Sequence, residues 1–405
     1  MADLRLRVEA TVSPVVERKM VYAGANSASF EAAGRDLKEL AGLEIRSERV
    51  RRATLRHGQA RCALARLLEE AFLDKSIPDQ LGAGPADQPA PPLAVVMGDG
   101  GRYQLFDRAT GKPASGSFWK ESRVAVLLSM KTQRFSTDPN AQLPDFLKDV
   151  SIAKKLAAIG KVSGENLTRA DQPVTAESPW QRPELLRKEV ISSGKHWKAF
   201  GPMVASSAWY HGFFAAEEKV FVSDGSSAIE EMQAEWFSCF TSVLDLMHAL
   251  SYSLAAARAI HGDGDPSWQC YCELATLIWQ GKVDELLRVL DSHQAHLGDP
   301  PAEARDTDAR EIVRRARVYY RNHRGRMNYP AYRKKGYPLT SSMMESTVKQ
   351  VSRRVKGTEK FWSSDGGEAI LRLRGDYLSE SRPMDDYWKQ RQMDANGFRS
   401  YSTSA

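Results

Sequence analysis

Three acidic residues stand where a carboxylate could take part in chemistry. Asp99 follows the apolar run LAVVM, Asp224 follows KVFVS, and a glycine comes directly after each. Glu345 lies near the start of a helix-like run, TSSMMESTVKQVSRRV, that is rich in hydroxyls, apolar residues and bases. Mg²⁺ prefers oxygen ligands, and two divalent ions about 3.5–4 Å apart stabilise both the attacking and the leaving oxygen of a phosphodiester transfer. We therefore expect Asp99, Asp224 and Glu345 to hold two Mg²⁺ or Mn²⁺ ions.

Each acid has an ordinary explanation when it is taken alone. Asp-Gly after a strand is common turn chemistry, and Glu345 stands four residues before Lys349, the spacing of a surface ion pair on a helix. One face of that helix would carry Glu345, Lys349 and Ser352 or Arg353, while the valines 348, 351 and 355 would share another. The combination of the three acids and their order along the chain favours the metal site.

Asp245 and His248, in VLDLMHAL, are a possible auxiliary pair, because at a helix start they would lie one turn apart. The alternative is a buried histidine satisfied by its own local aspartate. The acids of HGDGDP, residues 261–266, lack the further ligands of a Ca²⁺ loop, and this stretch is predicted to be a turn.

These residues need elements to position them. Short strands are predicted at 93–97, 102–106, 123–130, 220–222 and 242–244, with a tight turn at Gly100-Gly101. Residues 185–214 are expected to be mostly helical, and so are 150–159, 226–237 and 247–260. The predicted order is that of a ribonuclease H-like α/β fold: three strands, then a helix, a strand, a helix and a strand. Residues 268–279, 285–297 and 307–320 are predicted helices and no strand pattern occurs from 262 to 335, so this block is read as an all-α insertion.

The N-terminal part reads as helices from about 28 to 72, broken at Gly42, with Ser47 as the expected N-cap of a basic second helix. Such a pair suits either a helix-turn-helix reader of duplex DNA or a small bundle that only packs. Residues 75–92 are rich in Pro, Gly and Ala and are predicted to be a linker. The expected domains are 1–74 helical, 75–92 linker, 93–261 first part of the core, 262–335 insertion, 336–390 core completion and 391–405 tail.

Basic residues gather in one part of the chain. From Arg310 to Lys360 there are 15 Lys and Arg residues against three acids, with five tyrosines between them, although the whole chain has a net charge of only +6. Such asymmetry predicts a polyanion-binding face, and a solvated basic helix surface is the alternative. The side chains expected to contact DNA are Arg321, Arg326, Lys334, Lys335, Lys349, Arg353, Arg354 and Trp362.

Composition gives the broad class of the protein. At 405 residues, two or three domains are expected, and 42% hydrophobic with 27% charged residues is typical of a soluble globular protein. No run is long enough to span a membrane and no secretory signal is visible, so we expect a cytoplasmic, nucleoid-associated protein. The four cysteines form no CxxC pair, and we expect neither zinc nor disulfides.

The chain resembles bacterial insertion-sequence DDE transposases of the ISKra type, which are related to the Mutator-like group. The likeness covers roughly residues 28–390. It rests on DGG at Asp99, VFVSDGSSAI at Asp224, the DxxH element of Asp245 and His248, YPLTSSMMEST at Glu345, KFWSSDGGEAILRLR, and DDYW ending at Trp388. The resemblance implies that Asp99, Asp224 and Glu345 are the catalytic triad, and that Trp362 matches a tryptophan the family carries after its glutamate helix.

The resemblance further implies a homo-oligomer that binds terminal inverted repeats and target DNA, cleaves at the element ends and transfers the strand through the freed 3′-OH. One alternative is a catalytically inactive, transposase-derived DNA-binding protein. The feature that separates the enzyme from this alternative is the retention of all three acids. Another is a small-molecule phosphatase using Asp99, which has no evident use for so extended a basic segment.

Overall fold

The computed structural model describes residues 12–85, 88–107, 109–113, 117–159 and 182–396. They divide into two compact units. Unit 1 comprises Met1–Ser129, Leu186–Glu217 and Ser342–Ala405, and unit 2 comprises Met130–Leu185 and Glu218–Ser341. The predicted α/β class is confirmed, because strands and helices alternate through the middle of the chain.

The first described residues of unit 1 form the helices α2 (Pro14–Asn26), α3 (Phe30–Ala41), α4 (Ser47–Leu73) and the short α5 (Ile77–Gln80). Helices α2, α3 and α4 share a small apolar core that includes Met20, Leu37 and Val50. Gly42 ends α3 in the left-handed conformation at φ 64°, as predicted. The predicted N-cap at Ser47 is wrong by one residue, because Arg46 holds the extended capping position and Ser47 is already helical.

The strands of unit 1 are β1 (Leu93–Leu105), most of β2 (Trp119–Lys131) and β3 (Glu184–Ser193), in the order β3-β2-β1. The short β6 (Phe361–Trp362) pairs with β1 in parallel, opposite Gln104 and Leu105. The prediction of two strands with a turn at Gly100-Gly101 is wrong. Neither glycine has a positive φ, and the backbone continues as one extended strand through both.

The prediction that residues 185–214 are mostly helical is wrong in its first third. Glu184–Ser193 is the strand β3, which lies beside β2, and helix α7 starts only at Trp197 and ends at Tyr210. The segment ELLRKEVISS is predicted helical by its Leu, Lys and Glu, but pairing with β2 outweighs this weak local preference.

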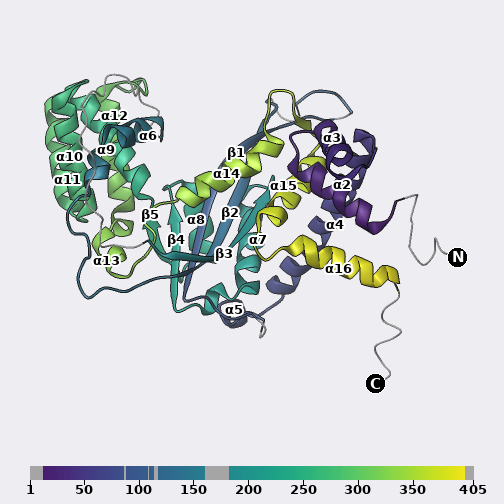
Figure 1. The fold of residues 1–405 in the computed structure, drawn as a ribbon. Helices are drawn as coiled ribbons and strands as arrows, with labels where there is room; N and C mark the ends of the chain where they lie inside the picture. The colour runs from purple at the N-terminus through teal and green to yellow at the C-terminus, as the bar shows by residue number, and fades with distance from the viewer. Residues whose placement is uncertain (1–11, 86–87, 108, 114–116, 160–181, 397–405) are drawn as a thin grey trace. The chain divides into compact units, whose positions relative to one another are not determined.

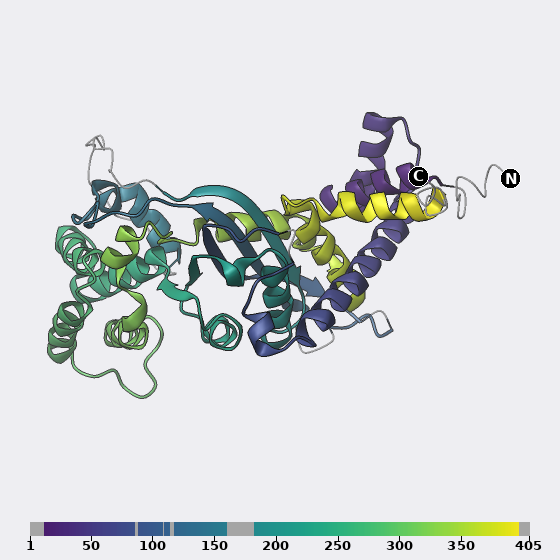
Figure 2. The same ribbon diagram turned by 90° about the horizontal axis from the view of Figure 1, so that it is seen from below.

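Apart from β6, the C-terminal part of unit 1 consists of the helices α14 (Ser342–Val355), α15 (Ser364–Leu378) and α16 (Pro383–Asn396). A short 3-10 helix, η2 (Phe213–Ala215), follows α7. Figures 1 and 2 show α14 lying along β1. Helix α15 packs against α4 at Gly58, where a methyl group would lie 2.7 Å from Ala369 Cβ. The N-terminal helices therefore belong to the same compact unit as β1, and the structure does not divide the chain at the predicted linker, residues 75–92.

Unit 2 contains the parallel pair β4 (Glu218–Ser223) and β5 (Thr241–Leu244), joined through α8 (Ser227–Trp236). Its other helices are η1 (Asp145–Lys148), α6 (Val150–Ile159), α9 (Leu246–His261), α10 (Asp265–Trp279), α11 (Val283–Leu297), α12 (Ala309–His323), η3 (Arg324–Arg326) and α13 (Tyr329–Lys334). The prediction that 262–335 is all helical is confirmed over this block. Among the described residues, no helix is both long and apolar enough to cross a membrane.

Candidate functional site

Asp99 lies inside β1 and not at its end. The strand is fully buried from Leu93 to Gly98 and becomes half-buried at Asp99, Gly100 and Gly101. Asp99 Oδ1 accepts a hydrogen bond from Gly100 N at 2.6 Å. The side chain is therefore fixed at the position where β1 leaves the core.

Helix α14 runs beside β1 in the same direction. A methyl group on Gly101 would lie 3.3 Å from Ser352 Oγ and 3.5 Å from Val348 Cγ1. Further along, Gln104 Nε2 donates to the carbonyl oxygens of Gly357 and Thr358, just beyond the end of the helix. The strand therefore meets first the middle of α14 and then the residues just after it, so that strand and helix advance in the same direction.

This register brings Glu345 level with Asp99. Glu345 precedes the midpoint of Val348 and Ser352 by five residues, which is about 7.5 Å along a helix at 1.5 Å per residue. The same distance along a strand at about 3.3 Å per residue corresponds to about two residues before Gly101, which is Asp99. The two carboxylates therefore lie at the same height in unit 1.

The two carboxylates also lie on facing sides. Glu345, Val348 and Ser352 share one face of α14, because their spacing of three and seven residues is that of a helix face. Alternate residues of a strand share a side, so Asp99 points to the same side of β1 as Gly101, which faces α14. Of the three valines predicted to share a separate apolar face, Val351 and Val355 are fully buried, but the prediction is wrong for Val348, which is half-buried and lies with Ser352 beside Gly101.

Glu345 is half-buried in the first turn of α14. A carboxylate is favoured there by the positive end of the helix dipole, typically by 0.3–1 kcal/mol. Among the residues that the structure describes, no ion pair joins Glu345 to Lys349, so the surface-pair explanation for this acid lacks its contact.

Asp224 belongs to unit 2 and follows the last residue of β4. Its Oδ1 accepts a hydrogen bond from Ser226 N at 2.8 Å, and its backbone carbonyl accepts one from Tyr319 Oη at 2.8 Å. Gly225 permits this turn with a φ of 89°. The prediction that Asp224 stands at the end of a buried strand is confirmed.

Asp245 and His248 form an internal structural pair. Asp245 is the N-cap of α9 and accepts hydrogen bonds from the backbone amides of His248 and Ser341. Burial opposes its ionisation, but these bonds and the nearby imidazole prevail and lower the pKa of Asp245. Asp245 is 1% exposed and its Oδ1 lies 3.3 Å from His248 Nδ1, but the histidine side chain is 27% exposed, so the structure shows a buried aspartate beside a half-buried histidine and not the buried histidine of the alternative.

A second network in unit 2 has no evident signal in the sequence. Arg326 binds Glu230 and donates to Ser223 Oγ at 2.8 Å, while His323 Nδ1 lies 2.9 Å from the same glutamate. Burial lowers the pKa of His323 despite the Glu230 carboxylate. The network ties α8 and α12 to the end of β4, directly before Asp224.

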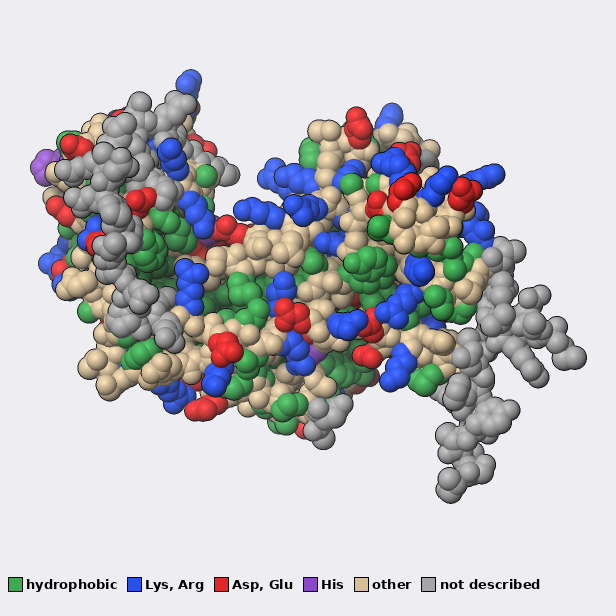
Figure 3. Space-filling view, viewed as in Figure 1, with side chains coloured by type: hydrophobic (Ala, Val, Ile, Leu, Met, Phe, Trp, Pro, Cys, Tyr) green, Lys and Arg blue, Asp and Glu red, His purple; other side chains and the backbone are tan. Residues whose placement is uncertain are grey.

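Most bases of the Arg310–Lys360 segment are paired with acids. Six arginines from Arg310 to Arg324 lie within 4 Å of a carboxylate, and four of the five acids involved are aspartates outside the segment; the pairs are Arg310–Asp308, Arg314–Glu311, Arg315–Asp306, Arg317–Asp291, Arg321–Asp291 and Arg324–Asp284. Figure 3 likewise shows acidic and basic side chains side by side over much of one face. Over α12, the predicted polyanion-binding face is thus a surface of mixed charge.

Three of the predicted DNA-contacting side chains are used inside the protein. Arg326 belongs to the network described above. Arg354 is 3% exposed, donates to Gly24 O at 2.9 Å and lies over the rings of Phe30 and Trp362. Trp362 is 7% exposed and donates to a backbone carbonyl. We withdraw the prediction of DNA contact for these three residues.

The other predicted DNA-contacting side chains remain accessible. Lys334, Lys349 and Arg353 are exposed, and Figure 3 shows basic side chains gathered over α14. Arg321 lies 3.9 Å from Asp291 and Lys335 lies 4.0 Å from Glu218, both at the limit of ion pairing. Exposed pairs of this kind are weak and could exchange their partner for a phosphate.

The C-terminal motifs of the resemblance have structural roles in unit 1. Ser363 caps α15, and Glu368 accepts bonds from Ser193 Oγ and Gly194 N at 2.6 and 2.7 Å. In the DDYW motif, Tyr387 Oη lies 2.8 Å from the buried His57 Nδ1. These motif residues join α15 to the end of β3 and α16 to α4.

No family model matches this sequence, and no curated protein matches it.

Proposed function

We propose that this chain is a metal-dependent polynucleotidyl transferase of the DDE transposase class, which cleaves double-stranded DNA at the ends of an element and joins them to target DNA. The observation that carries the proposal is the close approach of α14 to β1 at Gly101, from whose register we infer that Glu345 on α14 lies level with Asp99 on β1. Asp224 is the third acid of the proposal, as the resemblance implies.

The order of elements supports a ribonuclease H-like core. Strands β1, β2 and β3 are followed by α7, β4, α8 and β5, with η1 and α6 inserted before β3, and then by the helices of unit 2. Glu345 comes after this helical block, as the last acid of a DDE set does in the resembling family. The helical block corresponds to the proposed insertion.

The donor set suits hard divalent cations. In phosphoryl transfer Mg²⁺ and Mn²⁺ are bound by one or two carboxylate groups and keep water at their other coordination sites. Two such ions, when bound, supply an activated nucleophilic oxygen and stabilise the leaving oxygen. The short aspartate on a strand fixes one ligand rigidly, while the half-buried glutamate reaches from a helix whose exposed Lys349 and Arg353 can neutralise DNA phosphates.

The test is a cleavage and strand-transfer assay with purified full-length protein. The labelled duplex carries the DNA that flanks the coding sequence, incubated with Mg²⁺, Mn²⁺ or EDTA. We expect metal-dependent cleavage that falls roughly 100-fold or more in Asp99→Asn, Asp224→Asn and Glu345→Gln, with DNA binding kept. Glu359→Gln is the matched control, because Glu359 is an exposed acid in the same segment outside the triad.

The outcomes separate the proposed enzyme from its alternatives. Metal-dependent cleavage lost in all three variants and kept in the control supports the enzyme. DNA binding without cleavage by the unaltered protein replaces it with the inactive, DNA-binding descendant. Protein that neither binds nor cleaves DNA, or that cleaves equally well in all variants, overturns the proposal.

A further inference from the structure

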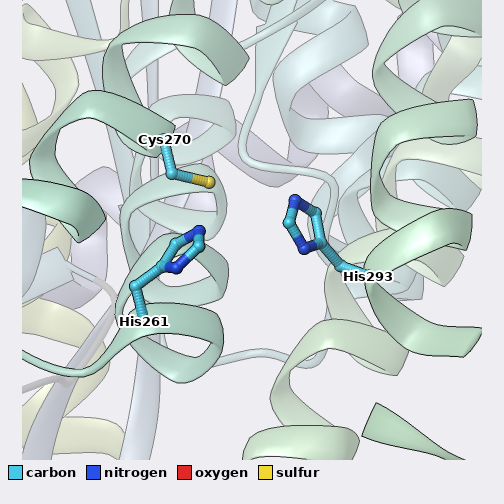
Figure 4. Close-up of side chains that lie close together, drawn as sticks. All are labelled: His261, Cys270 and His293. Atoms are coloured by element: carbon cyan, nitrogen blue, oxygen red, sulfur yellow. The ribbon is translucent and has the colours of Figure 1, made fainter. Parts of the chain in front are cut away.

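Three helices of unit 2 bring a soft donor set to one place. His261 is the last residue of α9, Cys270 lies in the second turn of α10, and His293 lies in the last two turns of α11. Figure 4 shows the three side chains pointing toward one another. One ligand atom from each, an imidazole nitrogen or the sulfur, lies within 4.8 Å of the others.

We propose that His261, Cys270 and His293 form a second, separate metal site of this protein, for a borderline-soft transition metal such as Zn²⁺. Zn–N bonds of about 2.0–2.1 Å and Zn–S bonds of about 2.3 Å place tetrahedral ligand atoms about 3.3–3.6 Å apart. The present separations, of up to 4.8 Å, are longer by about 1.2–1.5 Å at most, which small changes in side-chain torsion can close. The two imidazole rings are already 5.6 Å apart between centroids.

The backbone around the site is fixed by other contacts. The connection between α9 and α10 contains Gly262 at φ 73° and Gly264 at φ 118°, which turn the chain sharply after His261. Arg258 Nε donates to Asp263 Oδ1 at 2.9 Å and holds that connection against α9. Asp263 is thereby paired with Arg258, and the ligand atoms of the cluster are nitrogen and sulfur.

Glu273 offers a further ligand beside the cluster. It is one turn beyond Cys270 on α10 and is exposed. Its carboxylate or a water molecule would supply the fourth ligand.

A metal here would join three helices that are otherwise held by packing. Its ligands are 9 and 23 residues apart along the chain, so binding constrains α9, α10 and α11 in the folded state and stabilises unit 2 by mass action. The site differs from the proposed carboxylate site in ligand softness. Thiolate and imidazole select Zn²⁺, Co²⁺ or Cu²⁺ over Mg²⁺.

The test uses the full chain, freed of metal with a chelator and titrated with Co²⁺ and Zn²⁺. We expect one Co²⁺ per chain with tetrahedral d–d bands and a thiolate-to-metal charge-transfer band, which carboxylate ligands do not give. Zn²⁺ should displace the Co²⁺ and raise the melting temperature. Cys270→Ser should abolish the charge-transfer band, and His261→Asn or His293→Asn should weaken Zn²⁺ binding at least about tenfold.

The matched controls are Cys272→Ser and His296→Asn, which alter a neighbouring thiol on α10 and a neighbouring imidazole on α11 outside the cluster. Both should keep the band and the affinity. The proposal is overturned if the unaltered protein gives no charge-transfer band, or if the two controls lose it as Cys270→Ser does. Because this readout is spectroscopic and thermal, its failure is independent of any failure of DNA cleavage.

Discussion

Replacing Gly101 with valine should separate Glu345 from Asp99 without touching either acid. Gly101 stands between β2 and α14, where a single added methyl group would lie 2.8 Å from Ser122 Oγ and 3.3 Å from Ser352 Oγ. Valine adds two more carbon atoms that extend about 1.5 Å beyond that methyl group. Comfortable contacts between such atoms are about 3.5–4.0 Å, so α14 must move away from β1 by about 1–2 Å.

Two magnitudes follow from this displacement. Overpacking of a tightly packed contact costs about 1–3 kcal/mol of the free energy of unfolding. A misplacement of about 1 Å at a reacting centre costs about 100-fold in rate. We therefore expect Gly101→Val to lower stability modestly and the single-turnover rate of metal-dependent DNA cleavage about 100-fold, at a temperature where circular dichroism shows the variant folded.

A compensating substitution distinguishes displacement of the helix from general damage. Val348 Cγ1 lies 3.5 Å from the added methyl position, and Val348→Ala removes both methyl groups of that valine. The double variant Gly101→Val/Val348→Ala should therefore regain most of the lost cleavage. Gly325→Val is the control, because a methyl group there meets no heavy atom within 4 Å. Unchanged cleavage by folded Gly101→Val would refute the inference that α14 delivers Glu345 to Asp99.

Two further predictions concern the charged groups. Lys349→Ala and Arg353→Ala should each reduce the slope of log K for DNA binding against log salt by about 0.9. Arg354→Met should leave that slope unchanged and lower the free energy of unfolding by about 1–3 kcal/mol. Equal slopes for all three variants in a salt titration would contradict the assignment. Burial, with the Arg187 charge, lowers the pKa of His211 from 6.5 to about 4, so the folded state keeps this imidazole neutral. The contribution of this group to the free energy of unfolding is fully present above pH 6.5 and is lost as the pH falls toward 4, by up to about 3 kcal/mol. Urea unfolding at several pH values should show that His211→Gln removes this loss.

The sequence predicts elements well where local pattern decides them. The helices from α9 to α12 follow from apolar periodicity, and the buried strands around Val95 and Phe221 follow from short apolar runs. It fails at β3, where Glu184–Ser193 is a strand through its pairing with β2. It fails also at Gly100-Gly101, because glycine tolerates an extended strand as readily as a turn.

The candidate site was predictable in part for a related reason. The acids and their order can be read from the sequence, but the register of Glu345 against Asp99 depends on how α14 packs on β1. Counting charge along the chain overstated the basic face, because Asp284 and Asp291 come from elsewhere in unit 2 to pair with Arg324 and Arg317. The three proposed ligands His261, Cys270 and His293 have no recognisable spacing, because only the packing of three helices brings them together.

The glycines beside Asp99 favour a functional role for that acid. Glycine inside a strand destabilises it by roughly 0.5–1 kcal/mol relative to alanine, and neither Gly100 nor Gly101 is required by a positive φ. At Gly101 the use is steric, since a methyl group there would meet Ser122 and Ser352, whereas one on Gly100 would meet only the end of the flexible Glu121 side chain. The strand thus gives up stability where Asp99 emerges from the core, and this lets α14 approach closely enough for Glu345 to face it. A purely structural turn would need neither the extended backbone nor the opposing glutamate, whereas a pair of metal-binding carboxylates needs both.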